Sequence, residues 1–270
     1  MRLVIPAGRA RLIAGAVAGV LLLGWLSGLG TLHANDAGVT AVAGGPPPSA
    51  GPPPVRRPRP APSRPPVDCR KVKCVALTFD DGPGPYTSRL LRMLAARHAK
   101  ATFFLIGGNI HGREAVVRQE LAQGHAIGDH TWSHPDLSTL PEKRIRAQLT
   151  RTLTAITRAT GRPVHLMRPP YGATDRHVAK VARSLRLAQI IWDVDTDDWR
   201  DRNSAIVAHR AISRAHRGDI ILMHDIHPTT VRAVPKILRG LAKRGFTFVT
   251  VPELLAAHPL KPGRVYFDGR

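Results

Sequence analysis

Two adjacent carboxylates, Asp80 and Asp81, follow a short apolar run and precede Gly82-Pro83. The run Val75–Phe79 contains β-branched and aromatic residues and stops at the Gly-Pro pair, so we expect a buried strand that ends at the carboxylates. Neighbouring side chains on a strand point to opposite faces, and two buried carboxylates repel each other. A divalent cation would offset the repulsion; alternatively, both residues are turn residues that cap the next helix.

Two histidines, His130 and His134, have a spacing suited to metal ligands. On one helical turn, a spacing of four residues places both imidazoles on the same face and within reach of one ion. With Asp81 as a third ligand, the set would contain two imidazoles and one carboxylate. Such a set leaves coordination positions open for water and substrate, which is typical of a catalytic rather than a structural metal site.

The chain from Val75 onward alternates short apolar runs with longer amphipathic ones. We predict strands at Val75–Phe79, Ala101–Leu105, His125–Gly128, Val164–Arg168, Ala188–Val194, Asp219–His224 and Phe246–Val251. Helices are predicted between them, at Tyr86–Arg97, Arg113–Gln123, Pro141–Thr160, Asp175–Leu185, Asn203–His216 and Val231–Arg244. This alternation indicates parallel βα units, and their number favours an α/β fold, a distorted (β/α)7 barrel of the TIM type.

Polar residues gather where the predicted strands end. In a βα barrel, the carboxyl ends of the strands and the following loops form the catalytic face. Asp80 and Asp81 follow the first strand, and His130 and His134 follow the third. The other strand-end segments are Arg168-Pro169-Pro170-Tyr171-Gly172, Asp195 to Trp199, and Leu222-Met223-His224-Asp225.

These three segments, together with Thr78-Phe79-Asp80-Asp81-Gly82-Pro83 and His130-Thr131-Trp132-Ser133-His134, resemble the five ordered motifs of the polysaccharide deacetylase family. This family is the carbohydrate esterase group with a NodB-type domain. The resemblance spans about residues 74 to 257. It implies that Asp81, His130 and His134 bind one divalent ion, with zinc as the first choice and cobalt or another divalent ion as alternatives. Asp80 would be the general base that deprotonates the metal-bound water.

The resemblance also implies a general acid. His224 would protonate the departing amine, a role suited to a side chain with an unperturbed pKa of about 6.5. Asp198 would orient and charge that histidine, with Asp195 and Asp197 as rivals that the sequence does not exclude.

The remaining motif residues would support the same reaction. Arg168 would pair with the base, and the backbone N–H of Tyr171 would face the oxyanion. Trp199 and Leu222 would line a small apolar pocket for the acetyl methyl group. Asp129, next to His130, either orients that ring or is a turn residue.

The N-terminal segment, residues 1–34, has the features of an export signal. Arg2, Arg9 and Arg11 are followed by an uncharged apolar run, which at about nineteen residues comes near to the length that spans a bilayer. Ala34 would be the last residue of a cleaved signal peptide, whereas the Arg cluster fits an uncleaved anchor with its N-terminus inside. The protein is therefore expected to be exported, either anchored in the cell envelope or secreted.

Residues 35–67 are rich in Pro and Arg, which predicts a disordered linker or a polyproline spacer. The predicted catalytic domain covers residues 68–262, and residues 263–270 form a C-terminal tail. Cys69 and Cys74 are the two cysteines of the chain. In an exported protein they favour a disulfide, because their spacing is not that of a zinc clip.

The chain carries a net charge of +21, from 40 Lys and Arg against 19 Asp and Glu, spread along its whole length. Nucleic-acid binding would call for a basic stripe with interleaved aromatic residues or a known module, and neither is present. The charge favours attraction to an anionic cell envelope instead. A length of 270 residues suits one domain of about 200 residues plus extensions, which we expect to be monomeric.

Together, the residues and the resemblance predict an exported, metal-dependent hydrolase that removes N-acetyl groups from a β-linked amino-sugar polymer. Peptidoglycan N-acetylglucosamine is the first choice of substrate, chitin fragments the second, and O-acetyl groups of xylan-like polymers the third. The alternative from another class is a non-catalytic envelope protein that only holds glycan. The presence of both Asp80 and His224 argues against it.

Overall fold

Residues 67–258 and 260–270 are described by a computed structural model of the chain. The predicted signal or anchor, and the linker up to residue 66, lie outside the described residues. Among the described helices, none combines the length and the apolar character needed to cross a membrane.

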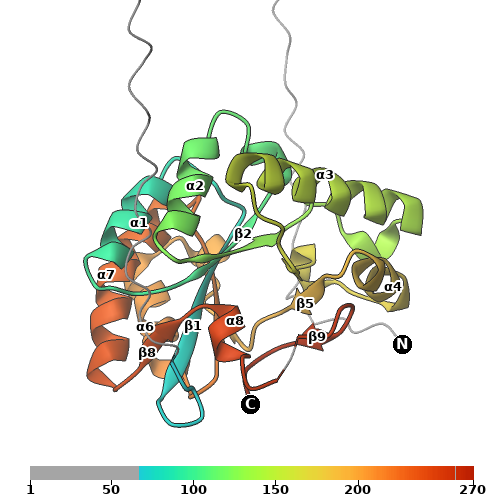
Figure 1. Ribbon diagram of the computed structural model, residues 1–270. Helices are drawn as coiled ribbons and strands as arrows, with labels where there is room; N and C mark the ends of the chain where they lie inside the picture. The colour runs from blue at the N-terminus through green and yellow to red at the C-terminus, as the bar shows by residue number, and fades with distance from the viewer. Residues whose placement is uncertain (1–66, 259) are drawn as a thin grey trace, which may run out of the picture. The chain divides into compact units, whose positions relative to one another are not determined.

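Nine parallel strands form one curled sheet (Figure 1). Their order is β6-β7-β1-β2-β3-β4-β5-β9, and β8 pairs with the start of β1. The strands are β1 (Cys74–Asp80), β2 (Thr102–Leu105), β3 (Ala126–Asp129), β4 (Leu166–Met167), β5 (Ala188–Ile190), β6 (Val194–Asp195), β7 (Ile220–His224), β8 (Thr247–Val249) and β9 (Val265–Tyr266). The fold class predicted from the strand and helix alternation is therefore confirmed.

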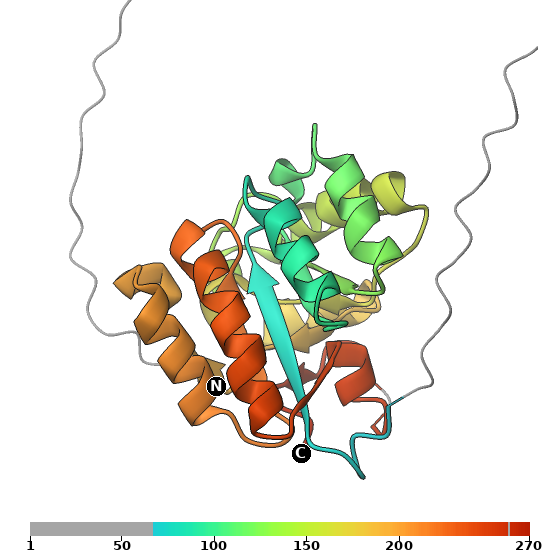
Figure 2. The ribbon, with the colours of Figure 1, turned by 90° about the vertical axis from the view of Figure 1, so that its left-hand side faces the viewer.

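Helices cover the outer face of the curled sheet. The long ones are α1 (Thr87–Ala95), α2 (Glu114–Ala122), α3 (Glu142–Thr160), α4 (Arg176–Ser184), α6 (Ser204–Arg214) and α7 (Pro228–Lys243). Neighbours pack in the order α6, α7, α1, α2, α3, α4. Figure 2 shows the first four side by side, with β1 visible between α7 and α1. Short helical turns lie in the loops: α5 (Asp198–Asp201), α8 (Val251–Leu254), η1 (Gly107–Asn109), η2 (Leu137–Thr139) and η3 (Pro170–Gly172).

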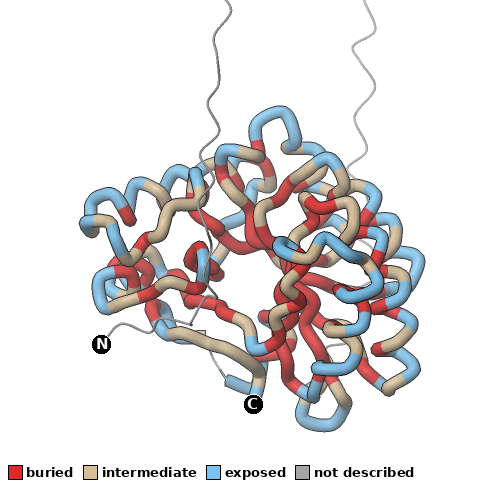
Figure 3. The backbone as a smooth tube through the Cα atoms, turned by 180° about the vertical axis from the view of Figure 1, so that it is seen from behind, coloured by how far each residue is buried: buried red, intermediate tan, exposed pale blue. Residues whose placement is uncertain are grey.

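Strand β1 is buried on both faces, as expected for the centre of a parallel sheet. Val75, Leu77 and Phe79 join the core cluster that contains the apolar residues of α1 and α7. Ala76 belongs to a second cluster, with residues of β5 and β8. Because alternate side chains share a face, Asp80 points with Ala76 to the inside of the curled sheet. Figure 3 shows the buried strands surrounded by partly exposed helices.

The predicted strand Ala188–Val194 is two strands in the structure. β5 ends at Ile190 and pairs with β4, whereas β6 begins at Val194 and pairs with β7, towards the other end of the strand order. At the bend between them, the carbonyls of Ile190 and Ile191 accept hydrogen bonds from the Arg168 guanidinium. A buried side chain thus satisfies backbone groups that the ladder leaves free, and no local pattern signals this.

The two ends of the described domain also differ in detail from the sequence pattern. Residues 263–270, predicted as a tail, contain β9, which pairs with β5. Arg270 forms ion pairs with Asp193 at 2.7 Å and Asp219 at 2.8 Å, so this segment packs against the sheet. At the other end, the sulfur atoms of Cys69 and Cys74 lie at disulfide distance, with 5.4 Å between their Cα atoms.

Candidate active site at the carboxyl ends of the strands

Asp80 and Asp81 face the same site although they are neighbours in the chain. Asp80 is the last residue of β1 and points inside the sheet, whereas Asp81 has a φ of 70°, in the left-handed region. At this turn the side chains no longer point alternately to opposite faces, so the carboxylate of Asp81 lies beside that of Asp80. The next helix begins at Thr87, and its N-cap residue is Tyr86. The alternative that the two carboxylates cap that helix is therefore wrong.

Gly82 allows this turn to pack closely against β7 and the loop that follows it. A Cβ atom at Gly82 would lie 2.7 Å from the Oδ1 atom of Asp225. The other carboxylate oxygen of Asp225 accepts a hydrogen bond from the Thr87 hydroxyl. A side chain at Gly82 would therefore have to displace this buried carboxyl group, which the Thr87 hydroxyl holds.

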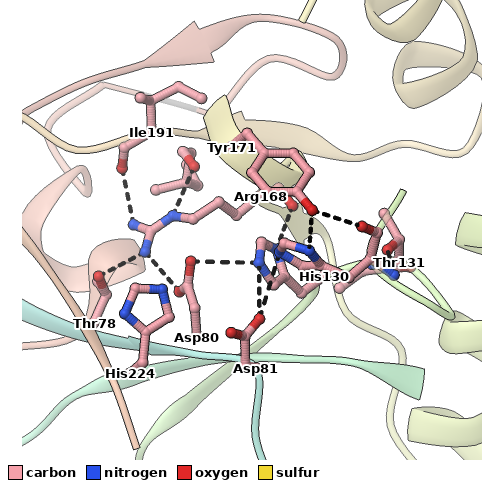
Figure 4. A network of polar contacts seen from close by, with 12 residues as sticks. Thr78, Asp80, Asp81, His130, Thr131, Arg168, Tyr171, Ile191 and His224 are labelled. Carbon is pink, nitrogen blue, oxygen red and sulfur yellow. Dashed lines mark hydrogen bonds and ion pairs between the residues drawn. The ribbon is translucent and has the colours of Figure 1, made fainter. Parts of the chain in front are cut away.

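Asp81, His130 and His134 bring three candidate ligand atoms within 4.8 Å of one another. Figure 4 shows Asp81 beside His130. The Nε2 atoms of both histidines lie 3.5 Å from the Oδ1 atom of Asp81. That oxygen is buried and has no hydrogen-bond partner among the described residues. Ligand atoms at the usual distance from a tetrahedral zinc ion are about 3.4 Å apart. The donor set and its spacing therefore fit a divalent ion.

The outer nitrogen of each histidine is held by a hydrogen-bond partner. His130 Nδ1 lies 2.7 Å from the carbonyl oxygen of Arg168, so it donates and leaves the Nε2 lone pair facing Asp81. Burial lowers the pKa of His130 to about 3, although the negative charge of Asp81 acts in the opposite direction. The low pKa keeps the ring in the neutral form that binds metal ions. His134 Nδ1 lies 3.2 Å from the Tyr171 hydroxyl.

The segment with both histidines is a loop, and the helical turn suggested by their spacing is absent. Thr131 and His134 have φ values of 67° and 59°, which no right-handed helix contains. The Gln148 side chain of α3 holds the loop instead. Its Oε1 atom accepts from the backbone N–H groups of Trp132 and Ser133, and its Nε2 atom donates to the Ser133 hydroxyl.

Asp80 forms a buried ion pair with Arg168. Nη1 of the guanidinium lies 2.7 Å from Asp80 Oδ1 and 2.8 Å from the Thr78 hydroxyl. Both charged side chains are at most 2% exposed. Burial raises the pKa of Asp80, and the charge of Arg168 opposes that rise. The carboxylate is thus more basic than an exposed one, and its orientation is fixed.

His224 is paired with Asp198. Its Nδ1 atom lies 2.8 Å from Asp198 Oδ1, and the other carboxylate oxygen accepts from the His224 backbone N–H and the Thr230 hydroxyl. Burial disfavours the charged ring, but the hydrogen bond and charge of Asp198 outweigh it, with further contributions from Asp80 and Asp81. The pKa of His224 therefore rises to about 9.

Of the three aspartates that the sequence left as candidates, Asp198 is the one that contacts His224. The Asp195 side chain accepts from the backbone N–H of Asp197. Asp197 in turn forms ion pairs with Arg200 and Arg210.

The other predicted residues lie around this centre. Tyr171 has a φ of 60° and a ring packed edge to face against His134, at 4.7 Å. Trp199 is 45% exposed on α5, and Leu222 is buried on β7, two residues before His224. Asp129 Oδ1 accepts from the backbone N–H of Thr131, which is a turn contact.

Sequence reasoning missed two of these contacts. Gln148 lies far along the chain from the histidine loop, on a helix that reads as an ordinary amphipathic one. The family resemblance gives Tyr171 a role for its backbone alone, whereas its hydroxyl lies 3.2 Å from Nδ1 of the candidate ligand His134. Neither contact has a local signal in the sequence, because each depends on how α3 and η3 pack near β3.

Residues 68–190 match the sequence profile of the family described as Polysaccharide deacetylase. A solved structure, described as T48 deacetylase with substrate, superimposes with a TM-score of 0.72 and 41% identity; the match covers 74% of this chain and 99% of the other. The chain belongs to the polysaccharide deacetylase family.

Two relatives with named activities have the same percentage identity to the chain. Peptidoglycan-N-acetylglucosamine deacetylase PgdA of Listeria monocytogenes is 40% identical over 73% of this chain. A chitin deacetylase of Pestalotiopsis sp is 40% identical over 69% of it. The chain spans 41% of the length of the first relative and 65% of the second.

Proposed function

We propose that this polysaccharide deacetylase family member is a metal-dependent hydrolase that removes N-acetyl groups from an amino-sugar polymer. Peptidoglycan N-acetylglucosamine is the proposed substrate. The observation that carries the proposal is the convergence of Asp81 Oδ1 with the Nε2 atoms of His130 and His134, beside the ion-paired carboxylate of Asp80. A base, a metal-ligand set and a charged histidine within one site are what amide hydrolysis requires.

Asp81, His130 and His134 would hold the ion, for which we propose zinc. When bound, the ion supplies Lewis acidity that polarises the acetamide carbonyl and makes a water molecule more acidic. Asp80 accepts a proton from the attacking water, and its raised pKa makes it the stronger base for this step. Arg168 keeps that carboxylate oriented throughout.

His224 completes the proposed reaction. With a pKa raised to about 9 it carries a proton at neutral pH, and it donates that proton to the amine nitrogen as the carbon–nitrogen bond breaks. Asp198 stabilises the imidazolium before the transfer. The products are acetate and a free amino sugar. We assign the oxyanion contact to the backbone N–H of Tyr171 and the acetyl-methyl pocket to Trp199 and Leu222.

The names of the relatives support a glycan substrate outside the cytoplasm. We propose that the protein is exported and acts as a monomer on acetylated wall glycan, held at the membrane if its N-terminal segment is uncleaved. Chitin is the second candidate substrate, because the chitin deacetylase and the peptidoglycan enzyme each have 40% identity to the chain.

Acetate release from acetylated chito-oligosaccharides, peptidoglycan and acetylated xylan tests the function and ranks the substrates. Asp80→Asn should lower turnover about 100-fold or more, because the base is lost. His224→Ala should lose turnover while keeping its metal, since this side chain is not in the ligand set. Full activity in Asp80→Asn would refute the base assignment.

The non-catalytic alternative makes a different prediction for the wild-type protein. A glycan-holding protein would bind one of the three polymers but release no acetate from any of them, with or without added zinc. That result would refute the proposed hydrolysis.

A further inference from the structure

Arg202 lies directly after α5, and two hydrogen bonds fix its guanidinium. The residue has a φ of 47°. Its Nε atom donates to the Trp199 carbonyl at 2.7 Å, and its Nη1 atom lies 2.7 Å from Nδ1 of His227. Among the described residues, Nη2 has no hydrogen-bond partner. The group is thus held in place with its Nη2 atom free to donate.

His227 connects this guanidinium to the proposed general acid. Its ring centroid is 5.8 Å from that of His224, and its side chain is buried. Because an arginine only donates hydrogen bonds, Nδ1 of His227 accepts, and the ring proton is on Nε2. Burial and the charge of Arg202 both lower the pKa of His227, which keeps this ring neutral. Within the Arg202–His227 pair, the positive charge is therefore that of Arg202.

The charge of Arg202 is unpaired, unlike that of its neighbours. Arg200 and Arg210 form ion pairs with Asp197 and Asp201. Within residues 67–258 and 260–270, no carboxylate lies at ion-pair distance from Arg202, which is exposed. The half-exposed ring of Trp199 belongs to the same short helix. A fixed guanidinium whose Nη2 group is still free to donate is well suited to bind a carboxylate through charge-assisted hydrogen bonds.

We propose that Arg202 binds a carboxylate on the glycan, carried near the acetamido group that reacts. The lactyl group of a muramic acid residue and a uronic acid residue both present such a group. The inference rests on the proposed function and adds a specificity determinant to it. Arg202 acts in substrate binding, so its contribution appears in KM more than in kcat.

A matched pair of substrates isolates this contact. One is an oligosaccharide of N-acetylglucosamine and muramic acid with free lactyl carboxylates; the other is the same saccharide with those carboxylates amidated. Arg202→Gln should raise KM for the free acid about tenfold at low salt, leave kcat nearly unchanged and leave the amidated saccharide unaffected. High salt should shrink the difference, because the guanidinium is exposed.

Arg158→Gln is the control, because it removes an equal charge from an exposed position on α3. It should change KM and kcat for neither saccharide. A uronic-acid-bearing, acetylated xylo-oligosaccharide, tested with its carboxylate free and reduced, distinguishes the second source of the carboxylate from the first.

Equal losses on both members of the pair would overturn the proposal, because they would show that Arg202 positions His224 or Trp199 instead. Unchanged kinetics on both would overturn it as well. Absence of acetate from every saccharide with wild-type enzyme would refute the proposed function itself. In that case, the role of Arg202 is tested by calorimetry, without turnover. The affinities of wild type and Arg202→Gln for the free and amidated saccharides show whether Arg202 binds the carboxylate.

Discussion

At the residue scale, Asp198 accepts hydrogen bonds from the ring and from the backbone N–H of His224. Its negative charge beside the ring favours the protonated form of His224. The pKa of His224 is raised to about 9, so its proton-donating form is present below that pH and is lost as the pH rises through it. The alkaline side of the activity profile should therefore report this group. The family resemblance favours Asp198 as this partner, and the contact with His224 excludes the rivals that the sequence leaves open, Asp195 and Asp197.

Asp198→Asn tests this directly. The substitution removes the charge that stabilises the imidazolium, so the pKa of His224 falls and the alkaline limb of kcat/KM should move about 1–2 pH units lower. Asp201→Asn removes the same charge from a pair with Arg200 and Arg210 and should leave the limb in place. If the alkaline limb lies at the same pH in wild type and Asp198→Asn, the assignment of Asp198 as the partner of His224 is contradicted.

The ion pair of Asp80 and Arg168 also makes a prediction about stability. Arg168→Gln leaves a buried carboxylate without its cation and should lower the free energy of unfolding by about 3–5 kcal/mol in urea titrations. Adding Asp80→Asn should restore part of that loss, because the unpaired charge is gone. Additive losses in the double variant would mean that the two side chains are not coupled.

At the element scale, the histidine loop depends on α3. The motif residues were found from the sequence, but their backbone was not: the spacing of His130 and His134 suggested a helical turn, whereas left-handed residues and the Gln148 side chain shape a loop. The prediction of one strand at Ala188–Val194 was wrong for a related reason, because a bend held by the Arg168 side chain divides this segment into two strands. Apolar periodicity reports burial, and it is silent on side chains that reach across elements.

Gln148→Leu should therefore weaken metal binding without touching a ligand. Loss of its acceptor oxygen leaves the N–H groups of Trp132 and Ser133 without their partner, and the zinc affinity, measured by competition with a chromophoric chelator, should fall about 10–100-fold. Gln148→Glu keeps an acceptor oxygen and should lose less. Gln119→Leu on α2 is the control, and equal affinities in Gln148→Leu and this control would exclude the bracing role.

At the scale of the whole molecule, the proposed ion links the ends of two strands, because its ligands follow β1 and β3. The overall barrel was predictable because, in each βα unit, a short apolar run is followed by a longer amphipathic one. The pairing of β9 with β5 was not, since a strand of two residues has no period to detect.

Zinc should therefore stabilise the folded chain. At 100 times its dissociation constant it should add about 2.7 kcal/mol, which corresponds to a rise in Tm of about 5–10 °C over protein held in chelator. Asp81→Asn removes one ligand and also relieves the repulsion with Asp80, so its metal-free Tm should not fall and zinc should shift it little. An equal zinc-induced shift in this variant would place the ion elsewhere.

The most direct test of the account is a zinc titration of metal-free enzyme, with acetate release from an acetylated amino-sugar oligomer recorded at each addition. We predict no release before zinc, a linear rise and a plateau at one ion per chain, because one set of three ligands is proposed to hold the ion that the reaction needs. Full activity in the metal-free enzyme, or no activity at any zinc concentration, would contradict it.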